Sequence, residues 1–249
     1  MFNKILFPVK KLSLIIVIFT LFYSCKNEVT TVEFSETAIE NNEHVNIEII
    51  YPKVTSKSGI ASKINSEIEQ TISKNIAFFE DDTEQLSLEA SIKDFENRYI
   101  NFKKEFEDSS IKWDANVSGE VVYNSENVIT IAIDSYTFTG GAHGNSVITL
   151  LNFNPKTGAL YSFDDIFNNP TKVTELAETY LEKELNISKN QNTDDYFFDE
   201  FFKMPENIGF SDEGIIFLYN TYEIAAYAQG VTEFTIPYSE ISEFLKLLE

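Results

Sequence analysis

The segment at residues 136–145 combines the residue types best suited to chemistry in this chain. Its sequence is YTFTGGAHGN, and it holds three glycines and one of the two histidines. A glycine-rich loop can expose backbone N–H groups to an anion, with His143 as hydrogen-bond donor or general base. The alternative is structural: a connection between strands that needs unusual backbone angles, with His143 bonded to backbone or carboxylate groups. No lysine follows the glycines, so the nucleotide-binding P-loop pattern is not met.

The segment at residues 219–230, YNTYEIAAYAQG, is the second candidate, because it places three tyrosines, a glutamate and a glutamine together. Tyrosine rings stack on a carbohydrate or peptide while polar groups orient it. The alternative is that the tyrosines anchor a long loop by burying their rings. We expect both loops to lie close in space, since both join strands of the same half. The candidate ligand-binding residues are Tyr136, Gly140, Gly141, His143, Asn145, Tyr222, Glu223 and Tyr227.

The counts of metal-binding and charged residues exclude several classes of function. One cysteine and two histidines, about a hundred positions apart, exclude cysteine-rich and multi-histidine metal sites. The segment at residues 194–202 lacks the central glycine of a calcium loop, and an amphipathic turn is favoured there. The net charge is −21 without a basic tract, so nucleic acid is a poor partner. We expect no metal, no cofactor and no catalytic residue set.

Residues 1–24 have the composition of a bacterial signal peptide. Three lysines precede an apolar run of 12 residues, at 12–23, which is too short to span a bilayer. The run ends at Ser24 and Cys25, and a small residue before the only cysteine resembles the lipobox of bacterial lipoproteins. We therefore predict that Cys25 is lipidated and anchors the mature protein to a membrane. The alternative is a buried free cysteine in a membrane anchor helix.

Cleavage before Cys25 would remove three lysines and no acidic residue, so the mature chain becomes more acidic. Such a surface repels anionic lipids and attracts basic proteins, so the lipid must supply the anchoring. Residue 26 is lysine rather than aspartate, which favours the outer membrane in a cell that has one. We expect an exported protein that faces the periplasm or the cell surface.

Two amphipathic helices are expected after a polar tether at residues 25–42. Isoleucines at every fourth position predict a helix from Ser58 to Phe79. A second apolar stripe has spacings of 4, 3, 4, 3 and 4 residues and predicts another helix. The members of this second stripe are Leu88, Ile92, Phe95, Tyr99, Phe102 and Phe106.

Strands and a further helix dominate the rest of the chain. Asn169 and Pro170 are typical of an N-cap followed by the first helical position, and Ser239 suits the cap of a final short helix. The order predicts an α+β fold with an antiparallel sheet packed with helices, a helical N-terminal half and a strand-rich C-terminal half. Alternating or apolar runs predict strands at residues 44–51, 112–123, 128–139, 147–153, 214–220 and 233–237.

The second half holds an ordered set of motifs: YTFTGGAHGN (136–145), NFNPKTG (152–158), FDDIF (163–167), DEG (212–214) and YEIAAYAQG with IPYSEI (222–241). This set resembles the DUF3298 family. The helical half upstream is similar to its usual companion, DUF4163, and together they cover most of residues 43–245. Family relatives include the extracellular part of a lysozyme-sensing anti-sigma factor and a module that precedes a peptidoglycan deacetylase domain.

The resemblance implies an envelope module that contacts peptidoglycan or an enzyme that cleaves it, and we expect neither relative's own activity to transfer. The leading hypothesis is a lipid-anchored binding module for a cell-wall glycan or a basic wall hydrolase such as lysozyme. The alternative is an envelope hydrolase or other enzyme centred on His143. The expected division is a signal peptide (1–24), a tether (25–42), a DUF4163-like helical half (43–110) and a DUF3298-like β-rich half (111–249).

Overall fold

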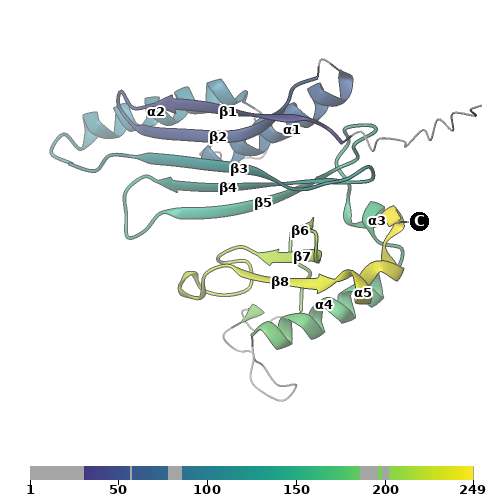
Figure 1. Cartoon of the computed structure of the whole chain (residues 1–249). Helices are drawn as coiled ribbons and strands as arrows, with labels where there is room; N and C mark the ends of the chain where they lie inside the picture. Colours follow the sequence, from purple (N-terminus) through teal and green to yellow (C-terminus); the bar gives the residue numbers. More distant parts are fainter. Residues whose placement is uncertain (1–30, 57, 78–85, 186–195, 198–201, 249) are drawn as a thin grey trace, which may run out of the picture.

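The computed structural model describes residues 31–56, 58–77, 86–185, 196–197 and 202–248. These residues form an α+β structure with one five-stranded and one three-stranded sheet, which confirms the predicted fold class. The two sheets lie side by side, and helices cover one face of the larger sheet (Figure 1). The predicted signal segment, Cys25 and most of residues 194–202 lie outside the described residues.

The five-stranded sheet has the order β1-β2-β3-β4-β5. Neighbouring strands are antiparallel except β2 and β3, which are parallel. A parallel pair needs a crossover connection, and two long helices provide it here. The strands are β1 (Phe34–Asn41), β2 (Asn46–Val54), β3 (Asp114–Asn124), β4 (Ile129–Phe138) and β5 (Asn145–Phe153).

Helix α1 (Gly59–Ile76) packs its isoleucine stripe against the sheet, as the spacing predicts. Ser58 caps the helix, because its side chain accepts a hydrogen bond from the N–H of Ala61 at 3.1 Å. The stripe then loses nearly all contact with solvent, and this burial is the main reason that the helix lies on the sheet. Its buried isoleucines are Ile64, Ile68, Ile72 and Ile76.

Helix α2 (Leu88–Glu105) packs its aromatic stripe around Trp113, the residue that leads into β3. The Phe95 and Phe102 rings lie 5.6 Å from the Trp113 ring and the Tyr99 ring lies 5.8 Å from it, centroid to centroid. Edge-to-face and tilted contacts of this kind add to the free energy of apolar burial. Trp113 therefore fixes the helix relative to the sheet.

The three-stranded sheet is antiparallel and packs against helix α4 (Pro170–Glu184) (Figure 1). Asn169 caps α4, because its side chain accepts from the N–H of Lys172, which confirms the predicted start. Its strands are β6 (Asn207–Phe210), β7 (Gly214–Tyr219) and β8 (Thr232–Pro237). The short elements are α3 (Phe163–Ile166), η2 (Tyr227–Gln229), α5 (Tyr238–Ile241), η3 (Ser242–Phe244) and η4 (Lys246–Leu248).

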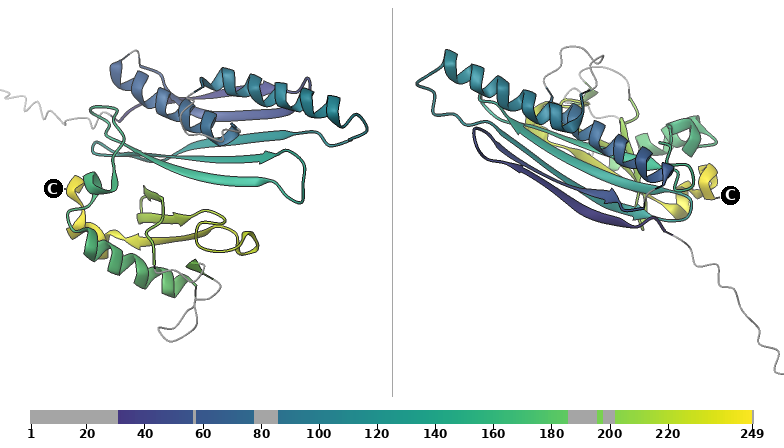
Figure 2. Two further views of the ribbon diagram at one scale, coloured as in Figure 1. Left: turned by 180° about the vertical axis from the view of Figure 1, so that it is seen from behind. Right: turned by 90° about the horizontal axis from the view of Figure 1, so that it is seen from above.

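The smaller sheet joins the larger one beside β5, as the left view of Figure 2 shows. Asn220 uses its side-chain amide like a short piece of strand: it accepts from the N–H of Ile148 and donates to the Ile148 carbonyl, both at 2.8 Å. Asn207 accepts from the N–H of Leu150 at 2.9 Å. These amides satisfy backbone groups that β5 would otherwise leave unpaired at its outer side.

Two features of the fold differ from the expectation or extend it. The tether predicted for residues 25–42 is wrong for Phe34–Asn41, which form β1. The reason is that β1 has no fully buried side chain and is mostly polar, so its sequence resembles a polar linker. The five-stranded sheet also takes strands from both sides of the expected boundary at residues 110 and 111. Among the described residues, no helix is long and apolar enough to cross a membrane.

Candidate functional site

The two unusual loops of the sequence meet in space. The first loop joins β4 to β5 and carries His143; the second joins β7 to β8 and carries two exposed or half-exposed tyrosines. The His143 ring stacks on the Tyr227 ring with centroids 3.9 Å apart and planes 16° apart. The Tyr222 hydroxyl lies 3.5 Å from His143 Nε2, and its ring lies 5.7 Å from that of Tyr227. Three of the candidate residues thus form one aromatic cluster.

Glycines give the first loop its shape. Gly140 has φ +94° and Gly141 has φ +107°, which confirms that the glycine run needs positive φ. Gly144 serves a different purpose, because a Cβ there would overlap the ring of Tyr136. The Tyr136 ring therefore lies close to the backbone of Gly144, with 37% of the Tyr136 area exposed, and it borders a different hollow from the one that His143 lines.

The second loop is held by Glu223, whose carboxylate accepts two backbone hydrogen bonds. Its Oε1 accepts from the N–H of Glu206 and its Oε2 from the N–H of Asn220, both at 2.8 Å. Both oxygens therefore serve the fold of the loop. Burial raises the pKa of Glu223, while the two backbone donors oppose that shift.

Tyr222 adopts a left-handed backbone conformation, with φ +69°, that residues other than glycine rarely take. Its N–H nevertheless donates to the Ala225 carbonyl at 3.1 Å, so the turn is ordered by hydrogen bonds. The side chain is 54% exposed. A strained residue that presents an aromatic ring to solvent is typical of a binding surface.

A pocket of about 270 Å³ adjoins His143. Asn75 of α1 lies on its wall and donates to the Ser135 hydroxyl at 3.0 Å. Side-chain amides and hydroxyls supply the polar groups, and the lining contains neither a carboxylate nor an ammonium group. The lining residues are Asn75, Ile76, Ala77, Thr137, Thr139, His143, Gly144 and Asn145.

The sequence predicted part of this pocket and missed the rest. His143 and Asn145 were candidates, whereas Asn75, Thr137 and Thr139 were not. Asn75 lies in the last turn of α1, next to the isoleucine stripe that predicted this helix, and only the tertiary fold brings it to the loop. A polar residue directly beside a buried stripe was the one signal that could have marked it.

His143 is held at both ring nitrogens. Nδ1 lies 2.8 Å from the Gly144 carbonyl, so the proton belongs on Nδ1, and Nε2 accepts from the Tyr222 hydroxyl. In the described part of the chain, no hydrogen bond joins His143 to a carboxylate. The arrangement is therefore suited to stacking and hydrogen bonding of an uncharged polar ligand.

A second surface of the molecule is acidic. Helices cover one face of the five-stranded sheet, and on the other face Glu40 of β1 lies directly opposite Glu48 of β2. Like charges in this position destabilise a sheet. A hollow of about 250 Å³ continues from Glu48 to Asp134 and Tyr136. The exposed acidic residues of this face are Glu36, Glu40, Glu48, Glu120 and Asp134.

In the comparison with known proteins, two family models match two separate segments of the chain. Residues 39–146 match the family model described as "Deacetylase PdaC", and residues 164–239 match that of the DUF3298 family of unknown function. The DUF4163 likeness expected upstream remains a prediction. A curated relative is the peptidoglycan-N-acetylmuramic acid deacetylase PdaC of Bacillus subtilis (strain 168), 25% identical over 170 residues. The match covers 64% of this chain and 36% of that relative, so this chain spans about a third of its length.

Two solved structures share the fold. A DUF3298 family member from Bacteroides fragilis NCTC 9343 has a TM-score of 0.67 at 21% identity, covering 88% of this chain and 95% of that one. A DUF3298 family protein from Pseudomonas aeruginosa PAO1 has a TM-score of 0.57 at 19% identity, covering 88% and 94%. At these identities the likeness concerns the fold alone.

Proposed function

The chain carries a DUF3298 domain behind a PdaC-like segment, and from this premise we propose that it is an envelope module that binds a cell-wall glycan at the aromatic loops. The observation that supports the proposal best is the stack of His143 on Tyr227 beside an uncharged pocket. Charged residues make up 24% of the chain, so a polar pocket without a carboxylate or ammonium group is unusual here. It suits a neutral sugar better than an ion.

The division of labour within this site follows from the side chains. The exposed ring of Tyr222 offers a face on which a pyranose can stack, as aromatic rings do in many polar binding sites. Asn75, Asn145 and the threonine hydroxyls on the pocket wall offer donors and acceptors for ring hydroxyls or an acetamido group. The curated relative acts on N-acetylmuramic acid in peptidoglycan, which agrees with a ligand of this class.

The proposal includes a lipid anchor at Cys25. Lipidation would hold the module at the membrane that faces the wall, most simply the outer membrane in a cell that has one. Cys25→Ser should abolish labelling of the full-length chain by a palmitate analogue and prevent release of residues 1–24. Unchanged labelling of the variant would contradict the anchor without touching the binding site.

The binding site is tested by sedimentation of the purified full-length chain with insoluble peptidoglycan. Tyr227→Ala should weaken binding by about tenfold, since it removes the platform for His143. Leu160→Ala is the control, because it also truncates a large side chain that solvent reaches but lies outside the site. Equal binding by wild type and Tyr227→Ala would overturn the proposed site. Release of soluble wall fragments that His143→Gln abolishes would instead assign the alternative, an envelope hydrolase centred on His143.

A second candidate partner is a basic wall hydrolase such as lysozyme, and the acidic face of the sheet favours it. Glu40 opposite Glu48 costs stability in the free protein, and a cationic partner would relieve that repulsion. Binding of lysozyme should exceed that of a different cationic protein of similar size at physiological salt, where the Debye length is about 8 Å. Glu48→Lys should weaken it. Equal binding of both cationic proteins would exclude this partner and leave the glycan.

A further inference from the structure

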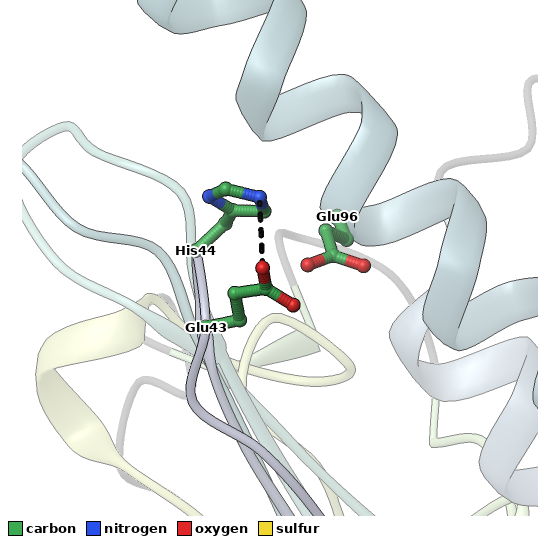
Figure 3. A group of neighbouring side chains, drawn as sticks. All are labelled: Glu43, His44 and Glu96. Atoms are coloured by element: carbon green, nitrogen blue, oxygen red, sulfur yellow. Dashed lines mark ion pairs between the residues drawn. The ribbon is translucent and has the colours of Figure 1, made fainter.

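A cluster of metal-ligating side chains lies apart from the aromatic loops, where the turn between β1 and β2 meets helix α2. Glu43 and His44 occupy the turn, and Glu96 reaches toward them from the middle of α2 (Figure 3). His44 Nε2 lies 3.9 Å from a Glu43 carboxylate oxygen. One ligand atom from each of the three residues can be chosen so that all lie within 4.8 Å of one another.

The backbones that carry these side chains are fixed by one residue. Beside His44, Val45 is fully buried, and the N–H of Asn46 donates to the Trp113 carbonyl at 2.9 Å. Beside Glu96, Phe95 is 1% exposed and packs its ring against that of Trp113. Trp113 thus positions both the turn and the helix, which are about fifty residues apart in the sequence. The core therefore holds in place the two backbone segments from which the three side chains extend.

We infer that Glu43, His44 and Glu96 form a binding site for a transition-metal dication of the zinc type. One imidazole nitrogen and two carboxylate oxygens are ligands that zinc accepts, at about 2.0–2.2 Å, with a fourth position for water. Imidazole disfavours magnesium and calcium, which prefer oxygen ligands only. Two carboxylates also balance the dication's charge in a chain whose net charge is −21.

The geometry requires only small side-chain movements. Two ligands of a tetrahedral zinc ion lie about 3.4 Å apart, so atoms now within 4.8 Å of one another need to approach by at most about 1.4 Å. Glu43 and His44 are exposed and Glu96 is half-exposed, so their rotamers can adjust while the backbone stays in place. The bound ion would then connect the β1–β2 turn to α2 and stabilise the folded state by mass action.

The test is titration of the purified full-length chain with Zn²⁺, followed by isothermal calorimetry and by thermal unfolding. We expect one equivalent to bind and to raise the unfolding temperature. His44→Ala and Glu96→Gln should each weaken binding by about tenfold or more and remove the stabilisation. The chain has only two histidines, so His143→Ala is a complete control for imidazole ligation elsewhere, and it should bind Zn²⁺ like the wild type.

Three outcomes would overturn the site. Absence of saturable Zn²⁺ binding would do so, as would wild-type affinity in His44→Ala. Loss of binding in Cys25→Ser with full retention in His44→Ala would assign the metal to the thiol instead. Because all three ligands are at least partly exposed, the circular dichroism of the variants should match the wild type, which separates lost ligation from lost folding.

Discussion

At the scale of single residues, His143 shows how neighbours define a side chain's chemistry. The Gly144 carbonyl and the Tyr222 hydroxyl occupy its two nitrogens, and Tyr227 covers one face of the ring. A general base needs a free nitrogen directed at a substrate proton. Because both nitrogens already have partners within the protein, the contacts of the imidazole suit a part of the proposed binding surface better than a general base.

Gly158 is a position at which adding a single methyl group should clearly lower the stability of the fold. It has φ +71°, and a Cβ there would lie 2.8 Å from the backbone oxygen of Ile60. Gly158→Ala should therefore lower the free energy of unfolding by about 1–3 kcal/mol, from left-handed strain and from overlap with a backbone that cannot move away. Gly141→Ala is the control, because it also has positive φ but open space around it. Urea unfolding measures both, and equal losses would show that the Ile60 contact is unimportant.

Glu223 should give the stability a characteristic pH dependence. The carboxyl has an ordinary pKa of 4.5, and burial raises the pKa in the folded state. Between these two pKa values the folded state binds more protons than the unfolded state, so the free energy of unfolding falls as the pH rises through this window. Glu223→Gln removes this contribution, so its stability should fall less from about pH 4 to about pH 7. Urea midpoints across this range test it, with exposed Glu184→Gln as control; parallel curves for wild type and Glu223→Gln would contradict it.

At the scale of elements, the spacing of apolar residues predicted the helices that bury one face against the core. The isoleucines of α1 and the aromatic residues of α2 each face one core, so their spacing marked both helices to within a few residues. The strands β1 and β6 escaped prediction for opposite reasons. All four residues of β6 are buried, so this strand shows no alternation of buried and exposed positions. In β1 the positions largely alternate, but the inner ones are only half-buried and most residues are polar, so the apolar signal is weak.

The parallel pairing of β2 with β3 also could not be predicted from the sequence. Both strands were predicted, but the alternation of a strand reports only which side is buried and not the direction of its neighbour. That direction depends on where α1 and α2 return the chain, and the aromatic contacts of Trp113 decide it. The pocket could not be predicted from local patterns either, because its Asn75 and Asn145 come from α1 and β5 and meet only in the tertiary fold.

The junction of the two sheets should depend on Asn220. Asn220→Ala would leave the N–H and C=O of Ile148 without their partner, so we expect a loss of about 1–3 kcal/mol in the free energy of unfolding. Asn101→Ala, on the exposed surface of α2, is the matched control and should change stability by less than about 0.5 kcal/mol. Equal effects of the two substitutions in urea unfolding would mean that water replaces the amide at no cost.

At the scale of the whole molecule, the charge should make stability depend on salt. The chain carries a net charge of −21, and mutual repulsion of carboxylates disfavours the compact state. Raising the salt concentration shortens the Debye length from about 30 Å at 0.01 M to about 3 Å at 1 M. The unfolding temperature should therefore rise with sodium chloride and equally with potassium chloride. A fall would show that attractive ion pairs outweigh the repulsion.

The position of β1 at the outer edge of the larger sheet affects how copies of the protein behave at high local concentration. An edge strand is a template on which a second copy can add its own strand, and extended self-assembly begins in this way. Here Glu36 and Glu40 sit on β1, and pairing two such edges would continue the acidic face from one molecule into the next. Each added copy would bring further negative charge into register with the last. The charge pattern that weakens the fold of one molecule thus keeps many molecules apart when they are concentrated in a small space.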